Sequence, residues 1–200
     1  MILPVDAASI AAAAEALRRG EVVAYPTETV YGLGADPRSP EAVDRLFQVK
    51  GRAQDQPVLL IIAEPEDFER IVVVSDAARR CIDAFWPGPL TLVLPAKGAF
   101  PSGVQAPDGT VAVRCPACPA ARALARAFGG PITSTSANRA GAPPALRAAD
   151  AALDGVFCVL DGGELPPSAP STVYAPDRDE ILREGALSAE ALRRLEPQRQ

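Results

Sequence analysis

The chain has 200 residues, of which 48% are hydrophobic, and it carries a formal net charge of −5 with a pI of about 4.9. This length and apolar content suit one globular domain, and no stretch reads as a linker to a second one. The acidic balance argues against a basic field that would draw the chain to nucleic acid or to an anionic membrane. The sequence contains no apolar run long enough to span a membrane and no basic start of a signal peptide. We therefore expect a cytoplasmic protein without membrane contact.

The chain contains four cysteines and no histidine. Cys115 and Cys118 form a lone C-x-x-C pair, whereas a structural zinc site needs a second pair or histidines. A redox role is an alternative, because a predicted strand precedes the pair and a predicted helix follows it. We interpret the thiols as incidental. The lack of histidine excludes Ser-His-Asp and Cys-His catalysis, so the chemistry must depend on positioning, on charge and on a metal brought by the substrate.

The N-terminal part of the chain predicts a helix followed by a buried strand. The helix covers 7–19, with Asp6 as its cap. The apolar run over 22–25 predicts the strand, and Pro26 ends it because proline cannot donate to a strand ladder. The stretch Gly32-Leu33-Gly34 is then expected to be a loop whose backbone can approach a ligand closely.

A second helix is signalled at both of its ends. Ser39 supplies a capping hydroxyl, Pro40 suits the first helical position, and Gly51 ends the helix. The almost wholly apolar run over 58–62 then predicts a central strand that is covered on both faces.

Strands and helices continue to alternate along the rest of the chain. We expect helices over 64–70, 76–86 and 119–128 and after Ser188, and strands over 91–94, 110–114, 156–160, 171–174 and 180–183. The residues 131–133 lead into the motif at 134–138. The last two strands form a closing pair, the segment 161–170 is flexible, and 196–200 is a frayed tail. The pattern predicts an α/β or α+β chain with a mixed twisted sheet and helices on its faces.

The first group of candidate site residues is Lys50 and Arg52, at the end of the second helix. A cation at a helix C-terminus is stabilised by the helix dipole, so both residues could simply be capping and surface charges. The alternative is a polyphosphate clamp, in which lysine supplies a point charge and arginine a bidentate fork.

Two further groups consist of short polar side chains and one arginine near strand ends. Hydroxyls and an amide alternate at Ser134, Ser136 and Asn138, so they can point to one side of an extended segment, although such residues are also ordinary turn formers. Thr29, Arg114 and Ser171 each end or follow a predicted strand, where open α/β sheets place ligands. Arg114 could instead be an edge charge in solvent.

Three of these motifs together resemble a known family. They are the stretch YPTETVYGL at 25–33, the Lys-x-Arg motif at 50–52 and the stretch STSAN at 134–138. In this order they resemble the threonylcarbamoyl-AMP synthases, which have a YrdC-like domain, over about residues 8–187. The resemblance implies an open sheet around one large cleft in a single domain over 1–200. Because the chain ends near residue 200, we expect the short single-domain form.

The resemblance also implies a reaction. A nucleotidyltransferase, L-threonylcarbamoyladenylate synthase, would make threonylcarbamoyl-AMP and pyrophosphate from L-threonine, bicarbonate and ATP, with Mg²⁺ as the cofactor. The product would feed threonylcarbamoyladenosine modification of tRNA by a separate transferase complex, which is the expected partner. The same resemblance leaves two alternatives: an RNA-binding translation factor and a carbamoyl-transfer module. The acidic charge, the two lysines and the few aromatic residues argue against the RNA-binding alternative.

The site residues carried over from the family fall into two subsites. Lys50 and Arg52 would be catalytic and would bind the phosphates of ATP, even though Ala53 stands where relatives usually have proline. The other nucleotide residues would be Gln56, Thr110, Ser136, Asn138, Pro144 and Arg183, with Ser136 and Asn138 also near the magnesium. Threonine would be bound by Thr29, Arg114, Ser134 and Ser171. Glu28 receives no chemical role.

Overall fold

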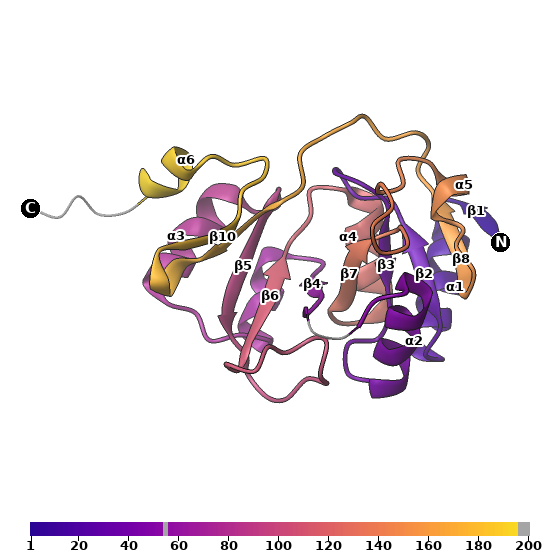
Figure 1. Cartoon of the computed structure of the whole chain (residues 1–200), viewed down its shortest axis with the longest axis horizontal. Helices are drawn as coiled ribbons and strands as arrows, with labels where there is room; N and C mark the ends of the chain where they lie inside the picture. Colours follow the sequence, from indigo (N-terminus) through magenta and orange to yellow (C-terminus); the bar gives the residue numbers. More distant parts are fainter. Residues whose placement is uncertain (54–55, 196–200) are drawn as a thin grey trace, which may run out of the picture.

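One ten-stranded sheet runs through residues 1–53 and 56–195, which are the residues described by this computed structural model. The strand order is β1-β8-β2-β3-β7-β4-β6-β5-β9-β10, with parallel and antiparallel neighbours mixed. The strands are β1 (Ile2–Pro4), β2 (Val22–Tyr25), β3 (Gly32–Gly34), β4 (Leu59–Ile61), β5 (Leu90–Pro95), β6 (Thr110–Arg114), β7 (Ile132–Ser136), β8 (Val156–Asp161), β9 (Thr172–Ala175) and β10 (Glu180–Arg183). This arrangement confirms the predicted mixed open sheet (Figure 1).

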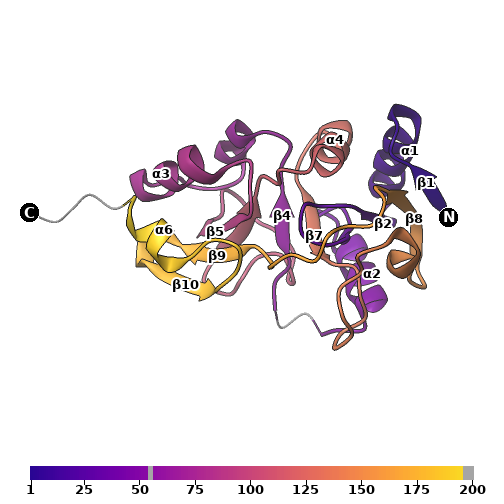
Figure 2. The same ribbon diagram turned by 90° about the horizontal axis from the view of Figure 1, so that it is seen from above.

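Helices cover both sides of this sheet. Figure 2 shows α1, α3 and α4 along one side and α2 on the other. The helices are α1 (Ala7–Arg18), α2 (Pro40–Lys50), α3 (Asp76–Phe85), α4 (Pro119–Phe128), α5 (Ala148–Ala151) and α6 (Ala189–Arg193), with 3₁₀ turns η1 (Pro65–Arg70) and η2 (Pro176–Arg178). Within the described residues, no helix combines the length and apolar character needed to cross a membrane. The predicted tail at 196–200 lies outside these residues.

The first two helices begin where the sequence predicted, and they end within one residue of the predicted ends, with α1 ending at Arg18 in place of residue 19. The side chain of Asp6 accepts a hydrogen bond from the backbone N–H of Ser9 and caps α1. Ser39 caps α2 in the same way, and Gly51 ends it with a left-handed backbone at φ 64°. Glycine adopts that conformation without the steric cost of a Cβ atom. Lys50 is thereby fixed at the last residue of α2, and Arg52 lies just beyond the turn.

Strand β4 occupies the centre of the sheet, between β7 and β6, as its apolar sequence predicted. Leu60 and Ile61 are buried on opposite faces, in the two hydrophobic clusters of the protein. The antiparallel pairing of β4 with β7 sets Leu59 opposite Ser134, and the parallel pairing with β6 sets Ile61 opposite Arg114. The central strand therefore aligns two of the predicted site residues.

The prediction of a loop over Gly32–Gly34 is wrong, because these residues form β3. A Cβ atom at Gly34 would lie 2.8 Å from the ring of Tyr25, so glycine makes room for that buried ring. The Tyr25 hydroxyl donates a hydrogen bond to the carbonyl of Thr133, which ties β2 to β7 across β3. Only Gly32 lines the cleft described below.

Two short elements escaped the sequence analysis. Strand β1 has three residues and pairs with β8, and α5 has four residues. Elements of this length carry too few residues to show a period of 2 or 3.6. The closing pair was predicted correctly, since β9 and β10 are antiparallel neighbours.

The segment 162–170 connects the two halves of the sheet. It leaves β8 and reaches β9, which lies beside β5 near the opposite edge (Figure 1). The hydrogen bonds that fasten it include those from the Tyr31 hydroxyl to the carbonyl of Gly163 (2.8 Å), from the N–H of Leu165 to the carbonyl of Leu146 (2.8 Å), and from the Ser168 hydroxyl to the carbonyl of Thr29 (3.0 Å). Ser168 and Pro170 of this crossover segment line the cleft.

Candidate functional site

A cleft of about 460 Å³ gathers most of the side chains that the sequence nominated. They come from strands β6, β7 and β10, from the end of α2 and from the loops between elements. The nominated residues in its lining are Thr29, Lys50, Arg52, Gln56, Arg114, Ser134, Ser136, Pro144, Ser171 and Arg183. Residues as distant in sequence as Thr29 and Arg183 thus line one cavity, as an open α/β sheet allows.

Lys50 is the centre of the first subsite. Its side chain is buried, and its Nζ donates hydrogen bonds to the carbonyl of Ser136 (2.5 Å), to the Ser136 hydroxyl (2.9 Å) and to Oδ1 of Asn138 (2.7 Å). The Ser136 hydroxyl also donates to Asn138 Oδ1 at 2.5 Å. Asn138 does not line the cleft, but it contacts the two residues that do. The predicted Lys-x-Arg and Ser-x-Asn motifs therefore form one connected group.

Burial lowers the pKa of Lys50 to about 8, and the nearby positive charge of Arg52 adds to this effect. Both causes penalise the ammonium form. The three acceptors around Nζ work in the opposite direction, because a charged ammonium has three hydrogens to donate. An anion entering the cleft would also favour the charged form. The Lys50 ammonium is thus partly desolvated, and its hydrogen-bond acceptors stabilise its positive charge.

Arg52 is held by its neighbours in an ordered position. Its guanidinium lies over the ring of Phe47, 5.4 Å from the centroid, and it donates a hydrogen bond to the carbonyl of Gln56. Its Nε is buried and makes no hydrogen bond within the described residues. Within residues 1–53 and 56–195, neither Lys50 nor Arg52 forms an ion pair with a carboxylate. The charge of neither cation is therefore neutralised by a carboxylate of the described residues.

Arg114 forms the second subsite at the end of β6. Its side chain is only 6% exposed, so the alternative of an edge charge in solvent is wrong. Its Nε donates to the carbonyl of Gly88 at 3.0 Å, and its Nη2 lies 2.6 Å from Oε1 of Glu28. A buried guanidinium that faces a cleft suits a carboxylate ligand.

Hydroxyl groups line the same cleft as Arg114. The hydroxyls of Thr29 and Thr27 lie 3.0 Å apart, and those of Ser171 and Thr91 lie 2.9 Å apart. Thr91 was missed by the sequence analysis, although a threonine inside the apolar run LTLVL was a usable signal. Such hydroxyls can donate to or accept from the amine and hydroxyl of a small polar substrate.

Arg183 lies beside residues that were nominated for threonine. It was nominated on the nucleotide side, yet it donates hydrogen bonds to the carbonyl and hydroxyl of Ser171, which was nominated for threonine. Burial lowers the pKa of Arg183, and the charge of Arg114 lowers it further. The positive charges of Arg114 and Arg183 are therefore close enough to repel each other.

Thr110 lies apart from this group. It starts β6, whereas Arg114 ends it, and its hydroxyl donates to Oδ1 of Asp108 at 2.6 Å. It does not belong to the lining of the cleft. Its role toward ATP stays a prediction.

The fit of a metal ion can be judged from the available ligands. Ser136 and Asn138 offer a hydroxyl and an amide oxygen, and the described residues contain no cluster of three or more Asp, Glu, Cys or His side chains that could hold a metal. Magnesium in proteins is usually held by one or two carboxylates together with substrate phosphates. These two oxygens fit a magnesium ion that arrives on a polyphosphate, as supplementary ligands.

The C-x-x-C pair lies outside the cleft lining. The thiol of Cys115 points to the carbonyl of Ala63 (3.8 Å) and that of Cys118 to the carbonyl of Pro26 (3.4 Å). No disulfide joins any of the four cysteines, all of which lie in the described part of the chain, and burial raises the pKa of Cys115 to about 12. A thiol with so high a pKa is a poor nucleophile near neutral pH.

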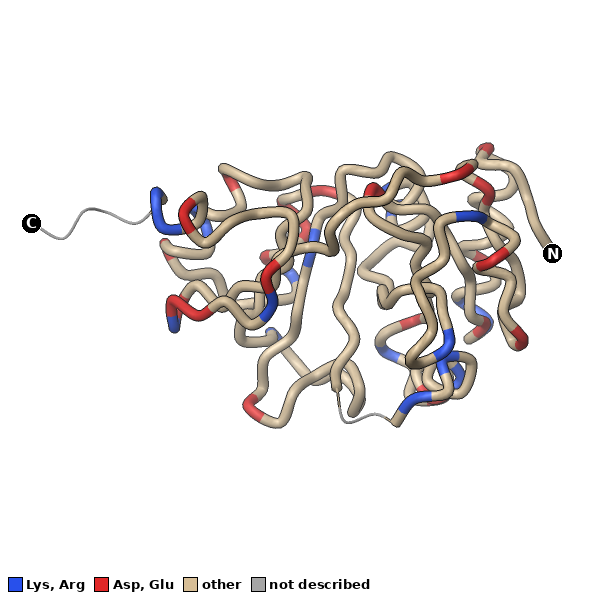
Figure 3. Tube along the Cα trace, turned by 45° about the horizontal axis from the view of Figure 1, so that its top comes forward, with Lys and Arg blue, Asp and Glu red and all other residues tan. Residues whose placement is uncertain are grey.

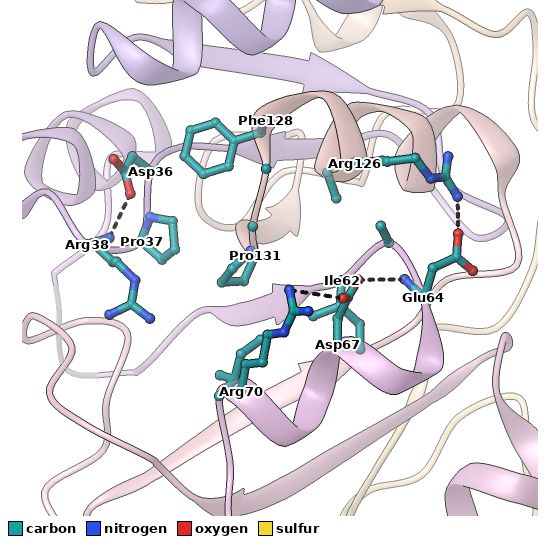
Figure 4. A pocket seen from close by; sticks show the side chains of 15 residues that line it. Asp36, Pro37, Arg38, Ile62, Glu64, Asp67, Arg70, Arg126, Phe128 and Pro131 are labelled. Carbon is teal, nitrogen blue, oxygen red and sulfur yellow. Dashed lines mark hydrogen bonds and ion pairs between the residues drawn. The ribbon is translucent and has the colours of Figure 1, made fainter.

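A second cavity, of about 540 Å³, lies beside α4 and η1 (Figure 4). Its charged side chains are largely paired with each other: Arg126 with Glu64, and Arg70 with Asp67 at 3.9 Å. None of the nominated site residues lines it. In the part of the chain drawn in colour, segments of Lys and Arg are interspersed with segments of Asp and Glu (Figure 3). The cleft of Lys50 and Arg114 is therefore the stronger candidate site for an anionic ligand.

The fold and the cleft define an open-sheet α/β protein with a cleft that is lined by a lysine and three arginines. The family model Sua5/YciO/YrdC, described as "Telomere recombination", matches residues 15–185. The threonylcarbamoyl-AMP synthase of Chromohalobacter salexigens is 41% identical over 87% of this chain and 96% of its own length. The chain belongs to the Sua5/YciO/YrdC family.

Longer relatives share only this part of their sequence with the chain. The threonylcarbamoyl-AMP synthase of Bacillus subtilis is 42% identical over 92% of this chain, which spans about half (55%) of the relative's length. The structure of Pyrococcus abyssi Sua5 complexed with L-threonine superposes with a TM-score of 0.90 at 38% identity, over 98% of this chain and 60% of that one. Escherichia coli YciO superposes with a TM-score of 0.81 at 26% identity, over 92% and 93% of the two chains.

Proposed function

We propose that this chain is an L-threonylcarbamoyladenylate synthase, which converts L-threonine, bicarbonate and ATP into threonylcarbamoyl-AMP and pyrophosphate. Relatives that share most of its length carry the corresponding name, and a structural relative was solved with L-threonine bound. The observation that carries the proposal is the composition of the cleft. It holds a cationic group around Lys50 and a second, hydroxyl-lined group around Arg114 in one cavity.

The chemistry asks little covalent help from the protein. The amine of threonine and bicarbonate combine to a carbamate with release of water, and a carbamate oxygen attacks the α-phosphorus of ATP while pyrophosphate leaves. Phosphoryl and nucleotidyl transfer depend mainly on alignment and on neutralised charge. In our proposal Lys50 and Arg52 neutralise the phosphates, and Arg114 holds the threonine carboxylate. Such a division needs no histidine, which this chain lacks.

The cofactor and the partners belong to the same proposal. Magnesium would enter with ATP, reach the oxygens of Ser136 and Asn138, and supply further charge neutralisation when it is bound. The product would pass in the cytoplasm to a tRNA threonylcarbamoyl transferase complex. Two observations support the threonine side: the buried guanidinium of Arg114 and the hydroxyl groups that line the same cleft.

The proposal predicts that pyrophosphate release from ATP requires both L-threonine and bicarbonate. The physical reason is that the nucleophile is the carbamate, which neither compound forms alone. The measurement is pyrophosphate release with Mg-ATP in carbonate-depleted buffer, with each substrate added separately and then together, and with the adenylate detected from labelled bicarbonate. Serine and alanine serve as matched amino-acid controls. Release at the full rate without threonine or without bicarbonate would contradict the proposed reaction.

A further inference from the structure

Glu28 lies between two threonines of the loop after β2, and the proposed reaction gives it no role. Its Oε1 accepts a hydrogen bond from the backbone N–H of Ala117 at 2.8 Å and lies 2.6 Å from Nη2 of Arg114. Glu28 is 22% exposed, and it is absent from the lining of the cleft that Arg114 helps to form. Its carboxylate therefore contacts a residue of the cleft lining, Arg114, without lining the cleft itself.

Arg114 is fixed by two separate partners. The carbonyl of Gly88 accepts from Nε, while the carboxylate of Glu28 lies against Nη2. Nη2 is buried and has no hydrogen-bond partner of suitable geometry within the described residues, and the same holds for Oε2 of Glu28. The contact with Glu28 thus places a negative charge directly against the guanidinium, while the hydrogen bond to Gly88 holds its Nε.

The charge balance of the cleft makes this contact distinctive. Lys50, Arg52, Arg114 and Arg183 all line the cleft, and among the described residues Glu28 alone forms an ion pair with one of them. A buried cation that loses its only carboxylate is left uncompensated, and its side chain gains freedom to turn toward other acceptors. A site residue whose own rotamer is locked by such support binds its ligand better.

We propose that Glu28 is a positioning residue that holds the Arg114 guanidinium in the orientation in which it binds the carboxylate of the amino-acid substrate. This inference rests on the proposed function, because it takes an α-amino acid as the ligand of Arg114. The competing effect is electrostatic: the Glu28 carboxylate also repels a substrate carboxylate, so its removal could strengthen binding. The geometry favours positioning, since Glu28 contacts Arg114 from outside the cleft lining.

The test is the substitution Glu28→Gln, which keeps an oxygen acceptor for the Ala117 N–H and removes the charge. The dissociation constant for L-threonine, measured by titration calorimetry on the full chain, should rise about tenfold, the scale on which supporting groups act. The KM for ATP in the pyrophosphate assay should stay within a few fold. The matched control is Glu64→Gln, which removes an arginine-paired carboxylate outside the cleft and should leave threonine binding unchanged.

A double-mutant cycle separates positioning from a general loss of structure. If Glu28 acts through Arg114, Glu28→Gln should add little to the threonine affinity already lost in Arg114→Ala. Glu28→Asp, which retains the charge, should recover part of the affinity and serves as the second variant if Glu28→Gln does not fold. Additive losses, or unchanged or tighter threonine binding in Glu28→Gln, would overturn the inference. A wild type that binds threonine without releasing pyrophosphate would refute the proposed function while still testing Glu28. A wild type that does not bind threonine would overturn both.

Discussion

Replacing Arg114 with alanine should raise the KM for L-threonine by about 30-fold to 1000-fold and leave the KM for ATP within a few fold. Loss of a charge-assisted pair from a buried site costs roughly 2–4 kcal/mol, which corresponds to that factor. The threonine carboxylate keeps its charge during the reaction, so the loss should appear in KM more than in kcat. The measurement is steady-state pyrophosphate release with each substrate varied in turn.

The control for this experiment is Arg147→Ala. Arg147 is an exposed arginine that pairs with Glu164 at 2.8 Å, outside the cleft lining. It should leave both KM values unchanged, because exposed ion pairs contribute little. If Arg114→Ala weakened ATP and spared threonine, the assignment of the two subsites would be wrong.

Replacing Lys50 with alanine should lower kcat about 100-fold and also raise the KM for ATP, while the KM for threonine changes little. Charge develops on the phosphates in the transition state, and loss of one preorganised cation in a site of this kind typically costs 10²–10³ in rate. The measurement is the same assay, with saturating threonine while ATP is varied. An unchanged kcat would contradict a catalytic role for Lys50 and would leave it as a capping charge.

The pH profile gives a second measurement on Lys50. Since burial lowers the pKa of Lys50 to about 8, the free protein loses this cation as the pH rises through that value. The ratio kcat/KM for ATP reports groups of the free enzyme and should therefore fall above about pH 8. In Lys50→Arg, which stays charged at this pH, the fall should disappear even if the rate is lower. A flat wild-type profile from pH 7 to 10 would show that Lys50 does not titrate in this range.

Local signals in the sequence predicted most of the elements correctly. Ser39 and Gly51 mark both ends of α2 because capping is decided by residues next to the helix end. The apolar run that contains β4 predicted a central strand because burial on both faces excludes polar side chains. Gly34 was misread, since the same glycine that suits a loop also suits a strand packed against a large ring.

Most of the residues that were nominated from the sequence line the cleft, but the sequence did not predict the hydrogen bonds and ion pairs that join them. The family resemblance nominated Lys50 and Ser136, and the structure joins them by a hydrogen bond across 86 positions of sequence. Glu28 and Ala117 are 89 positions apart, and their contact depends on how the loops after β2 and β6 are placed by the sheet. No local pattern encodes such a pair, so the support of Arg114 becomes visible only in three dimensions.

The hydrogen bonds of Lys50 have a consequence for how a nucleotide can bind. All three donors of the ammonium are already engaged with acceptors from Ser136 and Asn138. A phosphate oxygen can reach this ammonium only by displacing one of them, so its binding is an exchange of partners. The affinity for the nucleotide then depends on the difference in free energy between the phosphate contacts of Lys50 and the contacts with Ser136 and Asn138 that they replace. A Ser136 or Asn138 oxygen that is released in this way can bind a cation when the phosphate binds.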